Sequence, residues 1–68
     1  MKNIISKREK EILENISLGL TVNEIAKSLY LSPHTIITYK RNLLRKLEAK
    51  NAACLVRIAF EKRLLQVA

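Results

Sequence analysis

Apolar residues recur along this chain at intervals of three and four positions, the spacing that places side chains on one face of an α-helix. Four such stripes follow one another, and each is separated from the next by a short polar stretch. The stripes predict four helices, over about residues 7–18, 22–30, 33–47 and 51–65. Their inward positions are Ile12, Leu13, Ile16, Ile25, Ala26, Leu29, Ile36, Leu43, Leu47, Leu55, Val56 and Ala59.

Residues that cap helices stand at the start of each predicted helix. The capping signals are Ser6 with Glu9, Thr21 with Glu24, Ser32 with Pro33, and Asn51. The first two have the spacing of a capping box, and proline is favoured at a first helical position. The single glycine, Gly19, falls where a left-handed residue would end the first helix. No segment reads as a strand, so we predict one all-α domain over residues 1–68, a four-helix bundle.

The composition excludes several kinds of functional site. One cysteine, one histidine and no aspartate leave no set of metal ligands and no intrachain disulfide. No glycine-rich phosphate loop or nucleophile motif is present, so we predict no enzyme activity, no cofactor and no small molecule bound by this domain. The longest apolar run, Ala52–Val56, is far shorter than the roughly 20 residues of a membrane span. We therefore expect a cytoplasmic protein with no membrane partner.

Charge is unevenly distributed along the chain. Thirteen lysines and arginines against six glutamates give a net charge of +7. Residues 32–50 alone hold five basic side chains and one acidic side chain, which is more than half of the excess. A basic domain of this kind indicates nucleic acid or another anionic surface as its partner.

A short capped helix, a turn and a longer basic helix follow one another between Thr21 and Leu47, which is the layout of a helix-turn-helix. In such a motif the second helix enters the major groove of DNA, where its exposed face reaches the base edges. The outward positions of this helix are His34, Ile37, Thr38, Arg41 and Arg45, with Lys40 on the flank. We therefore predict double-stranded DNA as the partner of this face.

A family pattern runs through the same residues and covers about residues 5–65. It consists of Ser6-x-Arg8-Glu9-x-Glu11-Ile12-Leu13, Gly19-Leu20-Thr21-x-x-Glu24-Ile25-Ala26-x-x-Leu29, Leu31-Ser32-x-x-Thr35-Ile36 and Leu44-x-Lys46-Leu47. The combined pattern resembles the LuxR/NarL-type (GerE-type) helix-turn-helix of bacterial response regulators and quorum-sensing activators. The resemblance implies a domain that regulates transcription and binds two-fold-related DNA as a dimer. RNA polymerase is a further candidate partner.

The resemblance also implies roles for individual residues. The family's base-contacting positions fall on Ile37, Thr38 and Arg41. Its backbone-contacting positions fall near Thr21, Thr35, Lys40, Arg45 and Lys46. Arg41 is the candidate for a bidentate contact to guanine.

This chain departs from the family at several positions. Lysine is usual where this chain has Ile37, and an isoleucine can contact only apolar surface, such as a thymine methyl group. The other departures are Tyr39 (usually histidine), Glu48 (usually glycine), Ala49 (usually valine) and Arg63 (commonly glycine). The DNA target of this chain is therefore expected to differ from the usual one, or its affinity to rest more on phosphates.

The fourth predicted helix carries a second candidate surface, for a homodimer. Cys54, Ile58, Glu61 and Leu65 share the side that faces away from Leu55 and Ala59. An apolar pair on an otherwise exposed side suggests an interface, and the family commonly uses its fourth helix for the dimer contact. The alternative is that these residues pack locally against the first helix or the C-terminal tail.

Three rival interpretations fit parts of the sequence. The first is a piece resembling sigma-factor region four, against which the motif from Ser6 to Leu13 and the full fourth helix argue. The second is a protein-interaction module that keeps the helix-turn-helix shape without binding DNA. The unusual Ile37 and Tyr39 favour this interpretation. The third is a basic amphipathic binder of anionic membranes, against which the capped, segmented helices argue.

Overall fold

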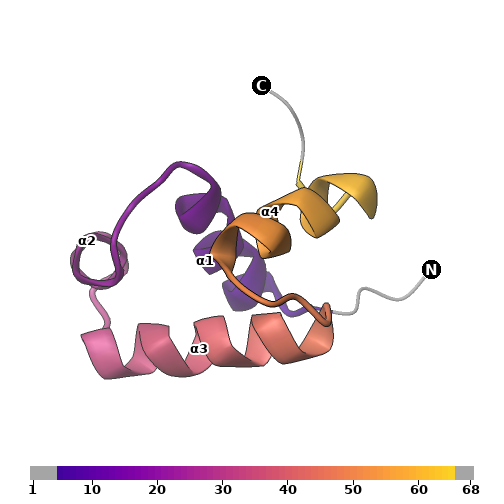
Figure 1. The fold of residues 1–68 in the computed structure, drawn as a ribbon. Coiled ribbons are helices and arrows are strands. Elements are labelled where there is room, and N and C mark those ends of the chain that lie inside the picture. Colours follow the sequence, from indigo (N-terminus) through magenta and orange to yellow (C-terminus); the bar gives the residue numbers. More distant parts are fainter. Residues whose placement is uncertain (1–4, 66–68) are drawn as a thin grey trace.

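The computed structural model describes residues 5–65, which form four α-helices joined by short turns (Figure 1). The helices are α1 (Lys7–Ser17), α2 (Val22–Leu29), α3 (Pro33–Lys46) and α4 (Ala52–Glu61). No strand occurs within residues 5–65, and the all-α class with its four predicted helices is confirmed. The first three helices end one residue earlier than predicted, whereas α4 ends at Glu61 rather than at residue 65.

Each helix begins at the capping residue that the sequence predicts. The Ser6 hydroxyl accepts the Glu9 N–H at 3.1 Å, and the Glu9 carboxylate accepts the Ser6 N–H at 2.8 Å. Thr21 and Glu24 make the same reciprocal pair at the start of α2. The other two caps are Ser32, which accepts the Thr35 N–H, and Asn51, which accepts the Cys54 N–H. These caps satisfy backbone donors that have no partner within their helix, so they set where each helix starts.

Each of the four helices is followed, within two positions, by a residue in the left-handed backbone conformation. These residues are Gly19, Tyr30, Glu48 and Arg63, with φ of 83°, 58°, 54° and 60°. In each case the N–H of the following residue reaches back five positions to a helical carbonyl, which is the Schellman pattern. Three of the four residues carry a side chain, so the sequence contains the usual glycine signal only at the end of α1.

The end of α4 corrects the prediction for Leu65. Arg63 turns the chain out of the helix, and the N–H groups of Leu64 and Leu65 both reach the Ala59 carbonyl, at 2.8 and 3.3 Å. This turn brings Leu65 back onto the core, where the residue is 6% exposed. Leu65 therefore does not extend the outer side of α4, and it is not part of a dimer surface there. The prediction failed because an arginine gives no sequence signal of a left-handed turn.

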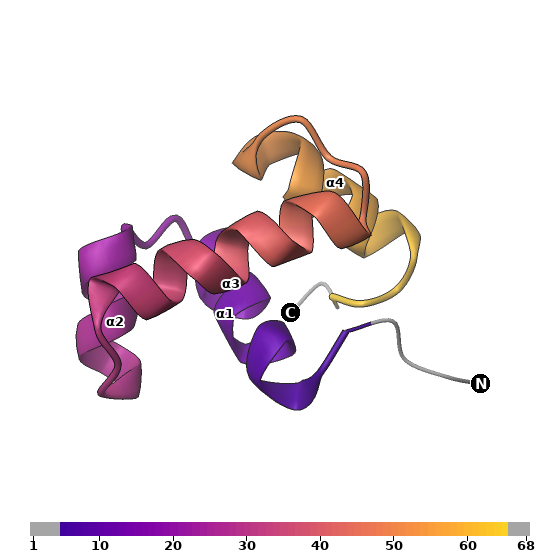
Figure 2. The same ribbon diagram turned by 90° about the horizontal axis from the view of Figure 1, so that it is seen from below.

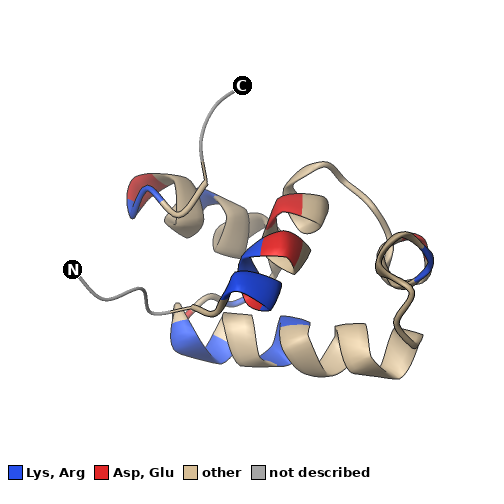
Figure 3. Cartoon of the chain, turned by 180° about the vertical axis from the view of Figure 1, so that it is seen from behind, with Lys and Arg blue, Asp and Glu red and all other residues tan. Residues whose placement is uncertain are grey.

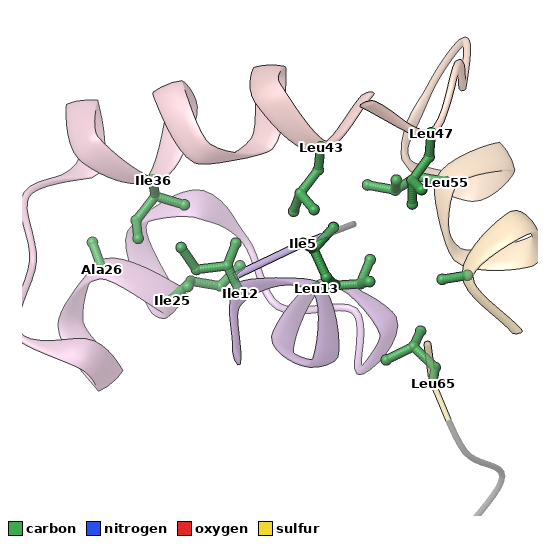
Figure 4. Packing of buried hydrophobic residues seen from close by; sticks show 11 residues of the cluster. Ile5, Ile12, Leu13, Ile25, Ala26, Ile36, Leu43, Leu47, Leu55 and Leu65 are labelled. Carbon is green, nitrogen blue, oxygen red and sulfur yellow. The ribbon is translucent and has the colours of Figure 1, made fainter. Parts of the chain in front are cut away.

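The core lies between α1 and α3 and is closed at its two ends by α2 and α4 (Figure 4). Its buried apolar residues are Ile5, Ile12, Leu13, Ile25, Ala26, Ile36, Leu43, Leu47, Leu55, Ala59 and Leu65. The predicted inward stripe of α3 is confirmed, because Ile36 and Leu43 are fully buried. The opposite side of α3 must then face outward, and Figure 2 shows that no other described helix covers it.

Candidate nucleic-acid interface

The outer surface of α3 gathers the residues that were predicted to face DNA bases. His34, Ile37, Thr38 and Arg41 are exposed, and so is Arg45 one turn further along. Ile37 is 42% exposed, although its neighbour Ile36 is wholly buried. The difference arises because one step along a helix turns a side chain through about 100°, from the core to the outer surface. The structure thus places all five residues on one uncovered face.

A shallow hollow lies along this face, lined by His34, Thr35, Thr38, Tyr39 and Asn42. Asn42 was missed in the sequence reasoning, although it follows Thr38 by one helical turn. Arg45 Nη2 donates a hydrogen bond to Asn42 Oδ1 at 3.2 Å. Because the carbonyl oxygen of the Asn42 amide is engaged, its two N–H donors remain to face a ligand.

Thr21 and Lys40, two of the predicted phosphate contacts, line one common hollow although Thr21 caps α2 and Lys40 lies on α3. The hollow forms where the α1–α2 turn, α3 and Ala52 at the start of α4 meet. The Thr21 hydroxyl accepts the Glu24 N–H at 3.2 Å, while the first N–H groups of α2 have no partner within the helix. A helix start beside a lysine is suited to a phosphate oxygen.

Lys46 is engaged in a different interaction from the one predicted. Its ammonium group donates to both carboxylate oxygens of Glu9, at 2.8 and 2.9 Å. Glu9 is 4% exposed, because α1 and α3 pack against each other. Burial acts to raise the pKa of Glu9, but the hydrogen bonds and charge of Lys46 and the hydrogen bonds of Ser6 outweigh it and hold that pKa below its ordinary value. The Lys46 side chain is still 38% exposed, so its contact with a phosphate stays a prediction, although Glu9 partly offsets its charge.

The basic side chains of α3 stand without acidic residues on the same helix (Figure 3). They are Lys40, Arg41, Arg45 and Lys46. With Lys46 paired to Glu9, the other three have no acidic partner within residues 5–65. Their charges are thus available to an external anion, and the phosphate backbone of DNA is the densest such partner.

The outer side of α4 is smaller than the sequence predicts. Cys54 and Ile58 are half-buried and Glu61 is exposed, whereas Leu65 has left the helix for the core. Phe60, which the sequence reasoning did not single out, is 37% exposed on the same helix. The apolar surface that α4 leaves to a partner is therefore modest.

Two kinds of feature do not occur in the part of the chain that the structure describes. None of the helices there has the length and apolar character needed to traverse a bilayer, and nowhere do three histidine, cysteine or glutamate side chains gather as metal ligands would.

Comparison with known proteins identifies the family of this chain. The GerE model, which describes bacterial regulatory proteins of the luxR family, matches residues 3–59. The CsgBAC operon transcriptional regulatory protein of Escherichia coli (strain K12) is 44% identical over 48 residues, which are 71% of this chain and 22% of that protein. The oxygen regulatory protein NreC of Staphylococcus carnosus is 42% identical over 62 residues, which are 91% of this chain and 29% of that protein.

A solved structure shows the same fold. The response regulator ChrA of a heme-sensing two-component system superposes with a TM-score of 0.89 at 31% identity, over 96% of this chain and 32% of that chain. The chain thus spans about a fifth to a third of the length of the proteins it matches. The family model describes regulatory proteins and the Escherichia coli relative is named a transcriptional regulatory protein, which confirms the prediction that this domain is not an enzyme. The chain belongs to the luxR family of bacterial regulatory proteins, as a helix-turn-helix DNA-binding domain of that family.

Proposed function

We propose that residues 1–68 act as one sequence-specific DNA-binding domain of a bacterial transcriptional regulator, with α3 in the major groove. The observation that carries the proposal is the division of α3 into two sides. Its inner side is held in the core by Ile36 and Leu43, and its outer side presents cations without acidic neighbours. The major groove of B-DNA is wide enough to admit such a helix. A cytoplasmic location follows from this partner.

Base contacts are proposed for the first three turns of α3. Arg41 is exposed and has no acidic partner within residues 5–65, so its guanidinium is available to O6 and N7 of a guanine. Ile37 and Thr38 lie one turn before it, and His34 lies in the first turn, where recognition helices approach the bases. These residues would supply sequence preference.

Phosphate contacts are proposed at both flanks of α3. Thr21 and Lys40 share a hollow and would hold one phosphate together with the start of α2. Thr35, in the first turn of α3, and Arg45 and Lys46, near its end, would hold others. Such contacts set the register of the protein on DNA and carry no sequence information themselves.

A homodimer on a two-fold-related site is proposed through Cys54, Ile58 and Glu61 of α4. The half-buried apolar pair Cys54 and Ile58 supports this, since each is partly open to a partner. The small area favours a dimer that forms on DNA, across half-sites about one helical turn apart. At a promoter the bound dimer would lie near RNA polymerase, which we propose as a further partner.

Fluorescence anisotropy with a random-sequence DNA duplex at several salt concentrations tests the DNA partner. We expect binding that weakens steeply with salt, by about 0.9 log units per phosphate contact for each log unit of salt. Lys40→Ala should reduce this slope by about one contact. Lys62→Ala, which removes the same charge at the exposed end of α4, serves as the matched control. No binding at low salt would contradict the proposal and favour the protein-interaction module.

A further inference from the structure

The first half of the outer face of α3 carries no charged side chain and includes an exposed isoleucine. Residues 33–39 contain no lysine, arginine, aspartate or glutamate, and the first cation of the helix is Lys40. Ile37 is 42% exposed in this stretch, although isoleucine has no polar atom with which to bind water or a base. An exposed apolar group beside the cations of a groove-binding helix is suited to an apolar feature of the DNA.

Thr38 adds a methyl group to this surface. Its hydroxyl donates a hydrogen bond to the His34 backbone oxygen at 3.1 Å, so the hydroxyl hydrogen is engaged within the helix. What Thr38 offers to a ligand is its methyl group and an oxygen lone pair. The hollow that Thr38 shares with Tyr39 and Asn42 gives an external methyl group space beside it.

Thymine is the base that adds an apolar group to the major groove, because its C5-methyl group points into that groove beside the O4 acceptor. A G·C pair has no such methyl group, and the binding groups on its major-groove edge are the acceptors on guanine and the amino donor on cytosine. Packing either of these against Ile37 would strip water from polar atoms without replacing their hydrogen bonds, which is costly. The chemistry of the two side chains therefore discriminates between the two kinds of base pair.

We propose that this domain reads thymine methyl groups with Ile37 and Thr38. The proposal rests on the proposed placement of α3 in the major groove. Arg41 follows Ile37 by four residues, about 6 Å along the helix, so a guanine read by Arg41 would lie within about two base pairs of a thymine. The operator half-site then combines A·T pairs with a neighbouring G·C pair.

The test begins by selecting, from a library of random-sequence DNA duplexes, those that bind the 68-residue chain. The recovered site is then remade with deoxyuridine in place of single thymidines, which removes only the C5-methyl group. We expect thymine in the recovered half-site and about fourfold weaker binding at each contacted uracil. The Ile37→Ala variant should bind about equally to duplexes that carry thymine or uracil at the position that Ile37 contacts. Circular dichroism would verify that this variant keeps its helices.

A matched pair of substitutions at position 38 separates the methyl group from the hydroxyl group. Thr38→Val keeps the methyl group and should bind the thymine site as the parent does, whereas Thr38→Ser keeps the hydroxyl and should bind it several-fold more weakly. Three results would overturn the thymine inference alone. They are tighter binding by Thr38→Ser than by Thr38→Val, a G·C pair at the positions that Ile37 and Thr38 contact, and equal binding of the uracil and thymine duplexes at every position. Failure to enrich any sequence would overturn the proposed sequence-specific function together with it.

Discussion

One carboxylate oxygen of Glu9 joins the start of α1 to the end of α3. Glu9 Oε1 accepts the Ser6 backbone N–H and the Lys46 ammonium group, each at 2.8 Å. The capping box that starts α1 is thereby also one side of a partly buried ion pair. The pair fixes the last turn of α3 against α1, and so helps to orient the outer face of the helix that we propose to bind DNA.

Glu9→Gln is expected to destabilise the fold. Glutamine can still accept the Ser6 N–H, but it leaves Lys46 without an opposite charge beside the core. We expect a loss of about 1–3 kcal/mol in the free energy of unfolding, measured by chemical denaturation. Glu14→Gln removes the same charge from an exposed position on α1 and should change stability by less than about 0.5 kcal/mol. Equal effects of the two substitutions would show that the ion pair does not stabilise the fold.

Stability should fall as the solution is made acidic. The pKa of Glu9 is lower in the folded state than its ordinary value of 4.5, so the unfolded chain takes up a proton first. The stabilisation by Glu9 is therefore complete above the ordinary pKa and is lost as the pH falls through the folded-state pKa. Denaturation curves between about pH 3 and pH 7 would measure this. The curve for Glu9→Gln should be flatter than that of the parent; an unchanged acid slope would contradict the assignment.

Glycine at the ends of α3 and α4 should stabilise the protein. Glu48 and Arg63 adopt φ of 54° and 60°, a region that glycine enters without strain and that other residues enter at a cost. We expect Glu48→Gly and Arg63→Gly each to raise the free energy of unfolding by about 0.5–1 kcal/mol. Arg57→Gly, inside α4, is the control and should lower it by about 1 kcal/mol. Thermal unfolding of the three variants would show whether the signs differ as expected.

A charge at position 58 should separate dimer formation from DNA binding. Ile58 is half-buried on α4, and a lysine there would bring two like charges together across a two-fold interface. We expect Ile58→Lys to weaken binding to a duplex with two half-sites by about tenfold or more. Binding to a single half-site should stay the same, and this serves as the internal control. An equal loss on both duplexes would mean that the substitution damages the fold or the DNA face instead.

Several sequence predictions depend on signals that act over a few residues. Ser6 with Glu9 and Thr21 with Glu24 cap their helices through hydrogen bonds three positions apart, so their spacing alone predicted where α1 and α2 begin. The apolar stripe of α3 likewise specifies its inner side, because a helix returns to the same direction every three to four residues. Because Ile36 faces the core, Ile37 and Arg41 must face away from it. This is why the composition of the candidate DNA face could be inferred before the fold was known.

The local sequence alone determined the four helix starts, the inner and outer sides of α3 and the excess of positive charge on it, because each depends on near neighbours. Only the tertiary structure paired Lys46 with Glu9, 37 positions away in the sequence. The tertiary structure also placed Leu65 in the core, because the left-handed backbone of Arg63 turns the chain back. It brought Thr21 and Lys40 to one hollow as well. These outcomes depend on which surfaces α1, α3 and α4 bury against one another, and no short-range spacing specifies that packing.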